Sequence, residues 1–161
     1  MNAYVIYAFA LSVGLSTPMA GQTHPDFSGV WSVSSIRPAP TAQSGATSLP
    51  PSDLTIRQTA TQLSISRTAF DQVITATHDL AGTASTNKSG AVTRITTARW
   101  DKARLIIQGK ASQVTSQGYA AWTLTEIYTL NAKGHLEIDS EYVGDDGKVT
   151  RSVRELVEKA K

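Results

Sequence analysis

The chain has 161 residues, a formal net charge of +2, 40% hydrophobic residues and no cysteine. This length fits a single domain, and a near-neutral charge without a basic stripe excludes a typical nucleic-acid-binding protein. The lack of cysteine excludes disulfide bonds and a lipid-modified N-terminal cysteine. A domain of this size buries roughly two-thirds of the surface that its unfolded chain exposes, so its core can stabilise it without cross-links.

The N-terminal segment differs from the rest of the sequence. Residues 3–15 are almost entirely apolar, and small and turn-forming residues follow as far as Ala20. The run is shorter than the roughly 20 residues of a membrane span and fits the apolar region of a secretory signal. We therefore predict a signal peptide over residues 1–20 and one periplasmic or secreted domain over residues 21–161, without stable membrane insertion. An uncleaved anchor is the alternative, since neither Lys nor Arg precedes the apolar run.

Short alternating segments follow along the chain. Residues 29–36 alternate as a first strand, and residues 37–52 hold four of the six prolines and predict an extended connection near the mouth of the fold. Residues 83–91 are polar and rich in turn formers, which predicts a loop. Alternation predicts further strands within residues 53–59, 62–66, 73–78, 92–100, 104–110, 121–130, 135–143 and 148–157.

The number and spacing of these segments predict the fold class. Eight or nine short strands joined by tight turns, without a βαβ rhythm, predict an all-β protein, an antiparallel meander barrel of about eight strands. We expect strands to pair with their sequence neighbours, and the last strand to close against the first. The spacing of apolar residues from Val153 to Ala160 also suits a helix, but the preceding alternation favours a closing strand to about Val157.

Several motifs resemble those of a known family. The sequence PDFSGVW at residues 25–31 is followed by LTIRQ at 54–58, ARWDKARLII at 98–107 and WTL from Trp122. In this order they resemble a family of small exported bacterial domains, largely uncharacterised, with a lipocalin-like β-barrel. The Gly-x-Trp element within the first motif is similar to that of lipocalin and avidin-type barrels. The resemblance implies a lipocalin-like fold and says little about function.

The resemblance also implies structural roles for four residues. In lipocalin-like barrels the tryptophan of Gly29–Val30–Trp31 lies near the closed end and is packed by a basic residue of the last strand, here Arg151 or Arg154. A planar, weakly hydrated guanidinium is suited to lie on an indole face. The two arginines are three positions apart and face opposite sides of a strand, so only one can do so; we favour Arg154.

The alternation also predicts which side chains face inward. We expect the apolar residues of each alternating segment to be buried. The evenly spaced carboxylates Glu137, Asp139 and Glu141 should lie on the outer face. The residues expected inside are Trp31, Ile56, Leu63, Ile65, Leu105, Ile107, Trp122, Leu124, Leu136 and Ile138.

No motif predicts catalysis, a metal site or a cofactor. The sequence has no Gly-x-Ser-x-Gly, phosphate loop or HExxH pattern, and His24, His78 and His135 are not at a metal-ligand spacing. We therefore expect a protein that is not an enzyme and holds no metal or cofactor. His78 could serve as a lone haem ligand if its ring faced inward, but we interpret it as a solvated histidine at a strand end.

Two functions remain open. The barrel could bind a small apolar or amphipathic molecule at its open end, with Trp31, Trp122 and Tyr142 as candidate ligand-binding residues, although Trp31 fits better as the floor of the barrel. The alternative is a structural or interaction protein of the cell envelope whose barrel is filled by side chains and holds no ligand. An eight-stranded barrel can do either. We expect a monomer and no nucleic-acid partner.

Overall fold

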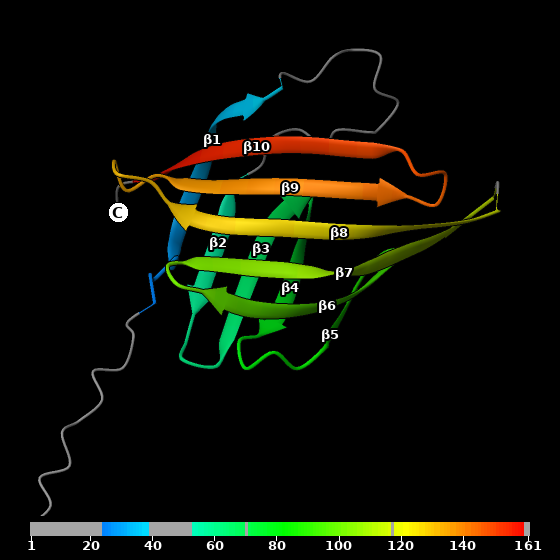
Figure 1. The fold of residues 1–161 in the computed structure, drawn as a ribbon, viewed down its shortest axis with the longest axis horizontal. Helices are drawn as coiled ribbons and strands as arrows, with labels where there is room; N and C mark the ends of the chain where they lie inside the picture. The colour runs from blue at the N-terminus through cyan, green and yellow to red at the C-terminus, as the bar shows by residue number, and fades with distance from the viewer. Residues whose placement is uncertain (1–23, 39–52, 70, 117, 160–161) are drawn as a thin grey trace, which may run out of the picture.

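One antiparallel sheet of ten strands forms the part of the chain that the computed structural model describes, residues 24–38, 53–69, 71–116 and 118–159, and curls into a barrel (Figure 1). The strands are β1 (Gly29–Arg37), β2 (Leu54–Gln58), β3 (Gln62–Ala69), β4 (Gln72–Asp79), β5 (Ser85–Ser89), β6 (Val92–Asp101), β7 (Arg104–Thr115), β8 (Gly118–Leu130), β9 (Leu136–Gly144) and β10 (Val149–Glu158). No helix in these ranges is long and apolar enough to cross a membrane. The predicted signal peptide at 1–20 and nearly all of the proline-rich segment at 37–52 lie outside the described residues.

The strand order confirms the predicted meander. It runs β4-β3-β2-β1-β10-β9-β8-β7-β6-β5, so all neighbours in sequence except β4 and β5 pair, and the first strand joins the last. The β1–β10 ladder pairs Trp31 with Glu158 and Arg37 with Val153. The C-terminal segment is strand, as predicted, because it completes this ladder on one side and pairs with β9 on the other. The described residues form ten strands rather than about eight.

The strand β5 (Ser85–Ser89) corrects the prediction of a loop over residues 83–91. The segment STNKS has no apolar alternation, which is the usual sign of a strand. It forms an edge strand paired with β6 alone, and its half-buried side chains Ser85, Asn87 and Ser89 are polar because they do not enter the apolar core.

Side chains, not a backbone ladder, join β4 to β5 within the described residues. The Asn87 side chain acts as a peptide group: its Oδ1 accepts from the Thr77 N–H at 2.7 Å, and its Nδ2 donates to the Thr77 carbonyl at 2.9 Å. Ser85 Oγ accepts from the Asp79 N–H at 2.9 Å. We call this β4–β5 junction the seam. It satisfies backbone groups that would otherwise be exposed along two sheet edges.

Apolar side chains fill one end of the barrel interior. Of the ten residues predicted inside, eight are buried, and Ile65 and Trp122 are half-buried. Trp31 is 3% exposed, and its indole N–H donates to the Phe27 carbonyl at 2.9 Å. We call this cluster the packed end; it contains Phe27, Trp31, Leu54, Ile56, Leu63, Leu80, Ala98, Leu105, Ile107, Tyr128, Leu136, Ile138 and Leu156.

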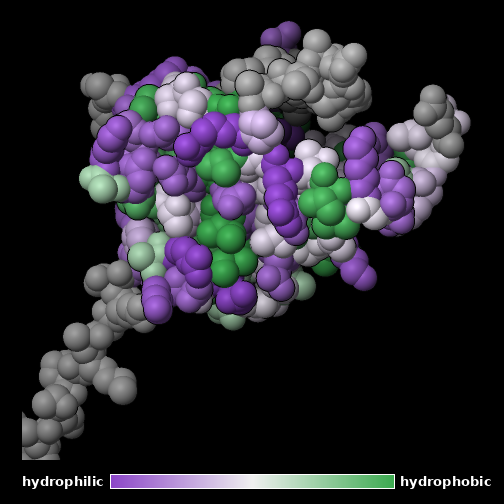
Figure 2. Space-filling model, turned by 45° about the horizontal axis from the view of Figure 1, so that its top comes forward, coloured by the Kyte–Doolittle hydropathy of each residue, from purple (hydrophilic) through white to green (hydrophobic). Residues whose placement is uncertain are grey.

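The predicted outer carboxylates lie on the outer face. Asp139 is exposed, Glu137 accepts from Asn131 Nδ2 at 3.2 Å, and Glu141 pairs with Arg151 at 2.5 Å. Figure 2 shows one face of the molecule, on which hydrophilic residues surround separate hydrophobic groups. This is the expected pattern for the water-facing side of an antiparallel sheet.

The predicted stacking of an arginine on Trp31 is wrong. Opposite Trp31 on β10 is Glu158, whereas Arg154 is opposite Ile36, five positions further along β1 and therefore about 16 Å away. Arg151 pairs with Glu141 on the outer face, and Arg154 approaches a buried carboxylate inside the barrel. Trp31 is in the packed end, but the strand register brings no arginine to it.

The seam generates the first prediction. Replacing Asn87 with Ala removes both hydrogen bonds to Thr77, so the free energy of unfolding should fall by about 1–3 kcal/mol and the Thr77 amide should exchange faster with solvent. Thr86→Ala, on the exposed face of the same strand, is the control. Chemical denaturation and amide hydrogen exchange measure the two effects. Equal Thr77 exchange rates in the two variants would show that Asn87 does not hold the seam.

Candidate functional site

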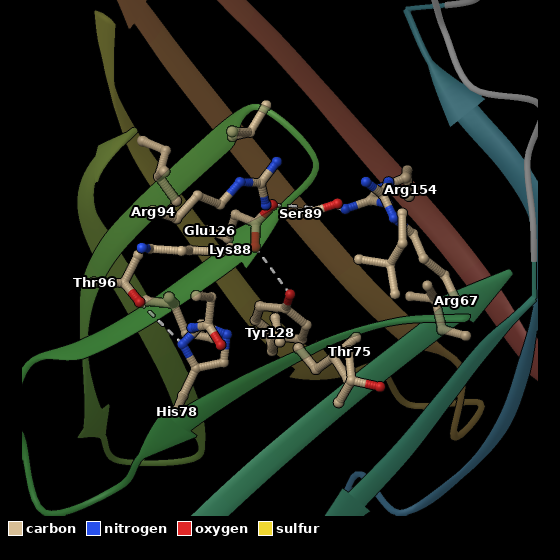
Figure 3. Close-up of a pocket in the computed structure, with 18 residues that line it drawn as sticks. Arg67, Thr75, His78, Lys88, Ser89, Arg94, Thr96, Glu126, Tyr128 and Arg154 are labelled. Carbon is tan, nitrogen blue, oxygen red and sulfur yellow. Dashed lines mark hydrogen bonds and ion pairs between the residues drawn. The ribbon is translucent and has the colours of Figure 1, made fainter. Parts of the chain in front are cut away.

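A cavity of about 130 Å³ lies inside the barrel beneath the seam (Figure 3). Strands from both sides of the seam and from the opposite wall contribute to it, because alternate residues of each strand face inward. Its lining consists of Leu54, Ile65, Arg67, Ile74, Thr75, Ala76, His78, Asn87, Lys88, Ser89, Val92, Arg94, Thr96, Ile107, Leu124, Glu126, Tyr128 and Arg154.

The cavity lining combines aliphatic walls with ionisable groups. Aliphatic side chains such as Ile65, Ile107 and Leu124 continue from the packed end. Arg67, Arg94, Glu126 and Arg154 form what we call the charged cluster, and Figure 3 shows these four side chains around the same cavity. The interior is therefore neither uniformly apolar nor completely filled.

Glu126 is the carboxylate of the charged cluster and is 7% exposed. The Tyr128 hydroxyl donates to its Oε2 at 3.0 Å, the Tyr142 hydroxyl donates to its Oε1 at 2.8 Å, and Arg154 Nη2 lies 3.9 Å from Oε1. Burial alone raises the pKa of Glu126, but the charge of Arg154, the tyrosine hydrogen bonds and the charge of Arg94 together lower it below its ordinary value. Glu126 is therefore ionised at neutral pH.

The arginines of the charged cluster outnumber their counter-ion. Arg154 approaches Glu126, whereas the side chains of Arg67 and Arg94 form no hydrogen bond or ion pair with any described residue. Burial lowers the pKa of Arg67, and the charges of Arg94 and Arg154 lower it further. Three guanidinium groups thus share one carboxylate, and the cavity has an excess of positive charge.

Strand alternation explains why these charged groups face inward. Arg67 continues the inward series of Leu63 and Ile65 on β3, and Glu126 lies between the inward Leu124 and Tyr128 on β8. Arg94 and Arg154 likewise share a face with buried neighbours on β6 and β10. Of these four residues, only Arg154 was singled out from the sequence, for a different role. The signal was present: an ionisable residue at a position where the apolar alternation requires an inward side chain.

His78 is buried, which corrects its interpretation as a solvated histidine. It is 6% exposed, and its Nδ1 lies 3.1 Å from the Thr96 hydroxyl. Because β4 continues to Asp79, His78 is within the strand. It therefore faces the cavity on the same side as Ile74 and Ala76. Burial lowers the pKa of His78; Glu126 opposes this change and Arg94 adds to it. His78 is therefore neutral at physiological pH.

The predicted ligand-binding residues lie in three different places. The hydroxyl of Tyr142 binds Glu126 in the charged cluster. Trp122 is half-buried on β8, paired with Ala111 and Gly144, and does not line the cavity. Trp31 is in the packed end. Only Tyr142 is therefore brought to the charged cluster, and a ligand-binding role for the three residues stays a prediction.

Glycine is needed at position 29, beside Trp31, because a side chain there would come too close to neighbouring atoms. Its φ is +155°, and a Cβ there would lie 3.0 Å from Glu158 Oε1 and 3.2 Å from the Trp31 indole nitrogen. A side chain at this position would displace the indole or the carboxylate.

Among the described residues, no group of three or more His, Asp or Glu side chains could hold a metal ion.

Solved structures share this fold at low sequence identity. Apo lipid binding protein 8 from Caenorhabditis elegans is 11% identical with a TM-score of 0.55, covering 83% of this chain and 95% of that one. The REP1-NXSQ fatty acid transporter is 10% identical, with a TM-score of 0.56 and coverages of 83% and 96%. Human cRBP IV is 14% identical, with a TM-score of 0.54 and coverages of 84% and 99%.

Sequence comparisons add no family assignment. No family model matches the chain, and no curated protein matches it. Identities of 10–14% show similarity of fold alone. The chain has the lipocalin-like and fatty-acid-binding-like barrel fold, in agreement with the prediction from sequence.

The burial of His78 generates a prediction about pH. Because the folded protein disfavours protonated His78, the unfolded chain binds more protons below about pH 6.5, and the free energy of unfolding falls as the pH decreases. Urea denaturation from about pH 7.5 to about pH 5.5 should show a larger loss of stability in the wild type than in His78→Asn. The other two histidines are common to both proteins, so their effect cancels. An identical pH dependence would contradict the burial of a neutral His78.

Proposed function

We propose that the protein binds a small amphipathic molecule inside its barrel, under the seam. The observation that carries the proposal is the cavity itself, which has aliphatic walls and a charged cluster within one pocket of the barrel. Ligand sites in proteins combine apolar lining with a few polar groups that fix orientation in the same way. Two proteins of similar fold are a lipid binding protein and a fatty acid transporter, which also supports an internal ligand.

The size of the cavity limits the ligand. A volume of about 130 Å³ is close to that of an engineered apolar cavity, about 150 Å³, that accommodates benzene. It is smaller than the roughly 300–1,000 Å³ of typical ligand pockets. A ligand of about six carbon atoms fits without rearrangement, whereas a long acyl chain would have to displace lining side chains or leave through the seam.

A filled barrel without a ligand is the competing function. The packed end favours it, because side chains fill that half of the interior to a continuous core. The cavity end favours binding, because a purely structural interior gains nothing from unpaired arginines, whose burial costs free energy. The two functions therefore predict different contents for the cavity.

We also propose that binding occurs outside the cytoplasm. The support is the apolar segment at residues 3–15, followed by small residues up to Ala20, at the N-terminus of a chain without cysteine. Cleavage after Ala20 would leave the described barrel intact, since its first described residue is His24.

Native mass spectrometry of the protein purified from its own host tests both proposals. We expect the mass of the denatured chain to correspond to residues 21–161. We expect the native mass to be larger than that of the denatured chain by the mass of a small molecule, which is released on unfolding. A chain that keeps residues 1–20 would contradict cleavage. A native mass equal to the chain mass would support the filled barrel.

A matched pair of variants locates the ligand. Ala76→Phe places a ring in the cavity and should abolish the extra mass, since Ala76 is one of its lining residues. Val73→Phe adds the same ring on the exposed face of the same strand, where Val73 is 71% exposed, and should retain it. Circular dichroism checks that both variants fold. Retention of the ligand by Ala76→Phe would place it elsewhere.

A further inference from the structure

Among the described residues that line the cavity, positive charges outnumber negative ones. Glu126 uses both carboxylate oxygens to accept from Tyr128 and Tyr142, and the nearest guanidinium is that of Arg154. Arg67 and Arg94 are half-buried, face the same cavity and form no hydrogen bond or ion pair with any described residue. Taking a charge out of water is costly unless a group of opposite charge accompanies it. The cavity thus holds three guanidinium groups, and the one carboxylate neutralises only one of them.

We propose that the cavity binds the oxyanion of its ligand, a carboxylate or a phosphate ester, through Arg67 and Arg94. The inference rests on the proposed binding function and specifies the class of ligand. A guanidinium presents planar donors that match a carboxylate or phosphate in bidentate geometry, which makes arginine suited to this recognition. The ligand's apolar part would then lie against the aliphatic wall that includes Ile65 and Ile107.

The remaining groups around the cavity do not reverse this charge. His78 is neutral because burial lowers its pKa, and it is paired with Thr96. Lys88 is an exposed residue of β5 at the cavity rim and adds a further positive charge. Glu126 repels an anion, but it is one carboxylate against three guanidinium groups. A cationic ligand would meet this excess charge, and a neutral ligand would leave Arg67 and Arg94 unpaired.

Binding of four probes to the full chain tests the ligand class by isothermal titration calorimetry. The probes are hexanoate, hexyl phosphate, 1-hexanol and inorganic phosphate. We expect hexanoate or hexyl phosphate to bind at least about tenfold more tightly than 1-hexanol, the magnitude expected for hydrogen bonds to charged groups. The ratio of the hexanoate and hexyl phosphate affinities distinguishes a carboxylate from a phosphate headgroup.

Variants assign the oxyanion to its residues. Arg67→Gln and Arg94→Gln should each weaken binding of the preferred anion about tenfold or more and leave 1-hexanol binding unchanged. Arg99→Gln is the matched control, because Arg99 is an exposed residue on the same strand as Arg94. Arg67→Lys keeps the charge and loses the planar donors, so it should show an intermediate loss.

Thermal unfolding without added ligand gives a second readout. If Arg67 and Arg94 bind the anion of a ligand, Arg67→Gln and Arg94→Gln should raise the midpoint of thermal unfolding of the ligand-free protein. The reason is that each substitution removes an unpaired cation from a positively charged interior. A lowered midpoint in both variants, with anion binding unchanged, would assign these arginines to structure and overturn the inference.

The outcomes separate this inference from the proposed function. Equal affinity for hexanoate, hexyl phosphate and 1-hexanol would overturn oxyanion recognition and leave ligand binding in place. Inorganic phosphate binding as tightly as hexyl phosphate would support the oxyanion site and contradict an amphipathic ligand. No binding of any probe, together with a native mass equal to the chain mass, would overturn both.

Discussion

The backbone ladder between β1 and β10 is the contact on which the barrel depends. It joins the first and last strands into one continuous sheet, so that the unpaired edges of the described sheet are those of β4 and β5. Asn87 and Ser85 bridge these edges with side chains, and the cavity lies directly beneath them. A junction made by a few side-chain hydrogen bonds opens more easily than a full ladder, since fewer interactions must break. The closure at β1–β10 therefore places the weakest part of the wall over the cavity.

The interior divides into two ends with opposite physical roles. Burial of aromatic and aliphatic side chains around Trp31 and Leu136 stabilises the packed end. The charged cluster opposes that stabilisation, because three guanidinium groups share the single carboxylate of Glu126. Proteins keep such locally unfavourable groups where function requires them, and the stability comes from elsewhere in the fold. The proposed binding function rests on this division of the interior.

Much of the fold could be predicted from sequence, because period-two alternation fixes both strand and face. The packed end, the outer carboxylates and the β1–β10 closure follow from this pattern. The strand β5 could not be predicted, since STNKS shows no apolar alternation and its pairing depends on β6. The charged cluster is a different case. Glu126 occupies an inward position between Leu124 and Tyr128, so alternation points to it, but its meeting with Arg67, Arg94 and Arg154 depends on the curvature of ten strands. Similarly, the burial of His78 depends on the extent of β4, which the apolar pattern leaves undefined.

The central claim is that the excess positive charge beneath the seam is matched by the anion of a ligand. A crystal structure of the protein grown with 6-bromohexanoate tests it most directly, because anomalous scattering locates the bromine atom of the ligand. The account predicts a carboxylate within hydrogen-bond distance of the Arg67 or Arg94 guanidinium, and bromine against the aliphatic wall of the cavity. Bromine only on the outer surface, with a protein carboxylate paired to Arg67 and water alone in the cavity, would contradict it.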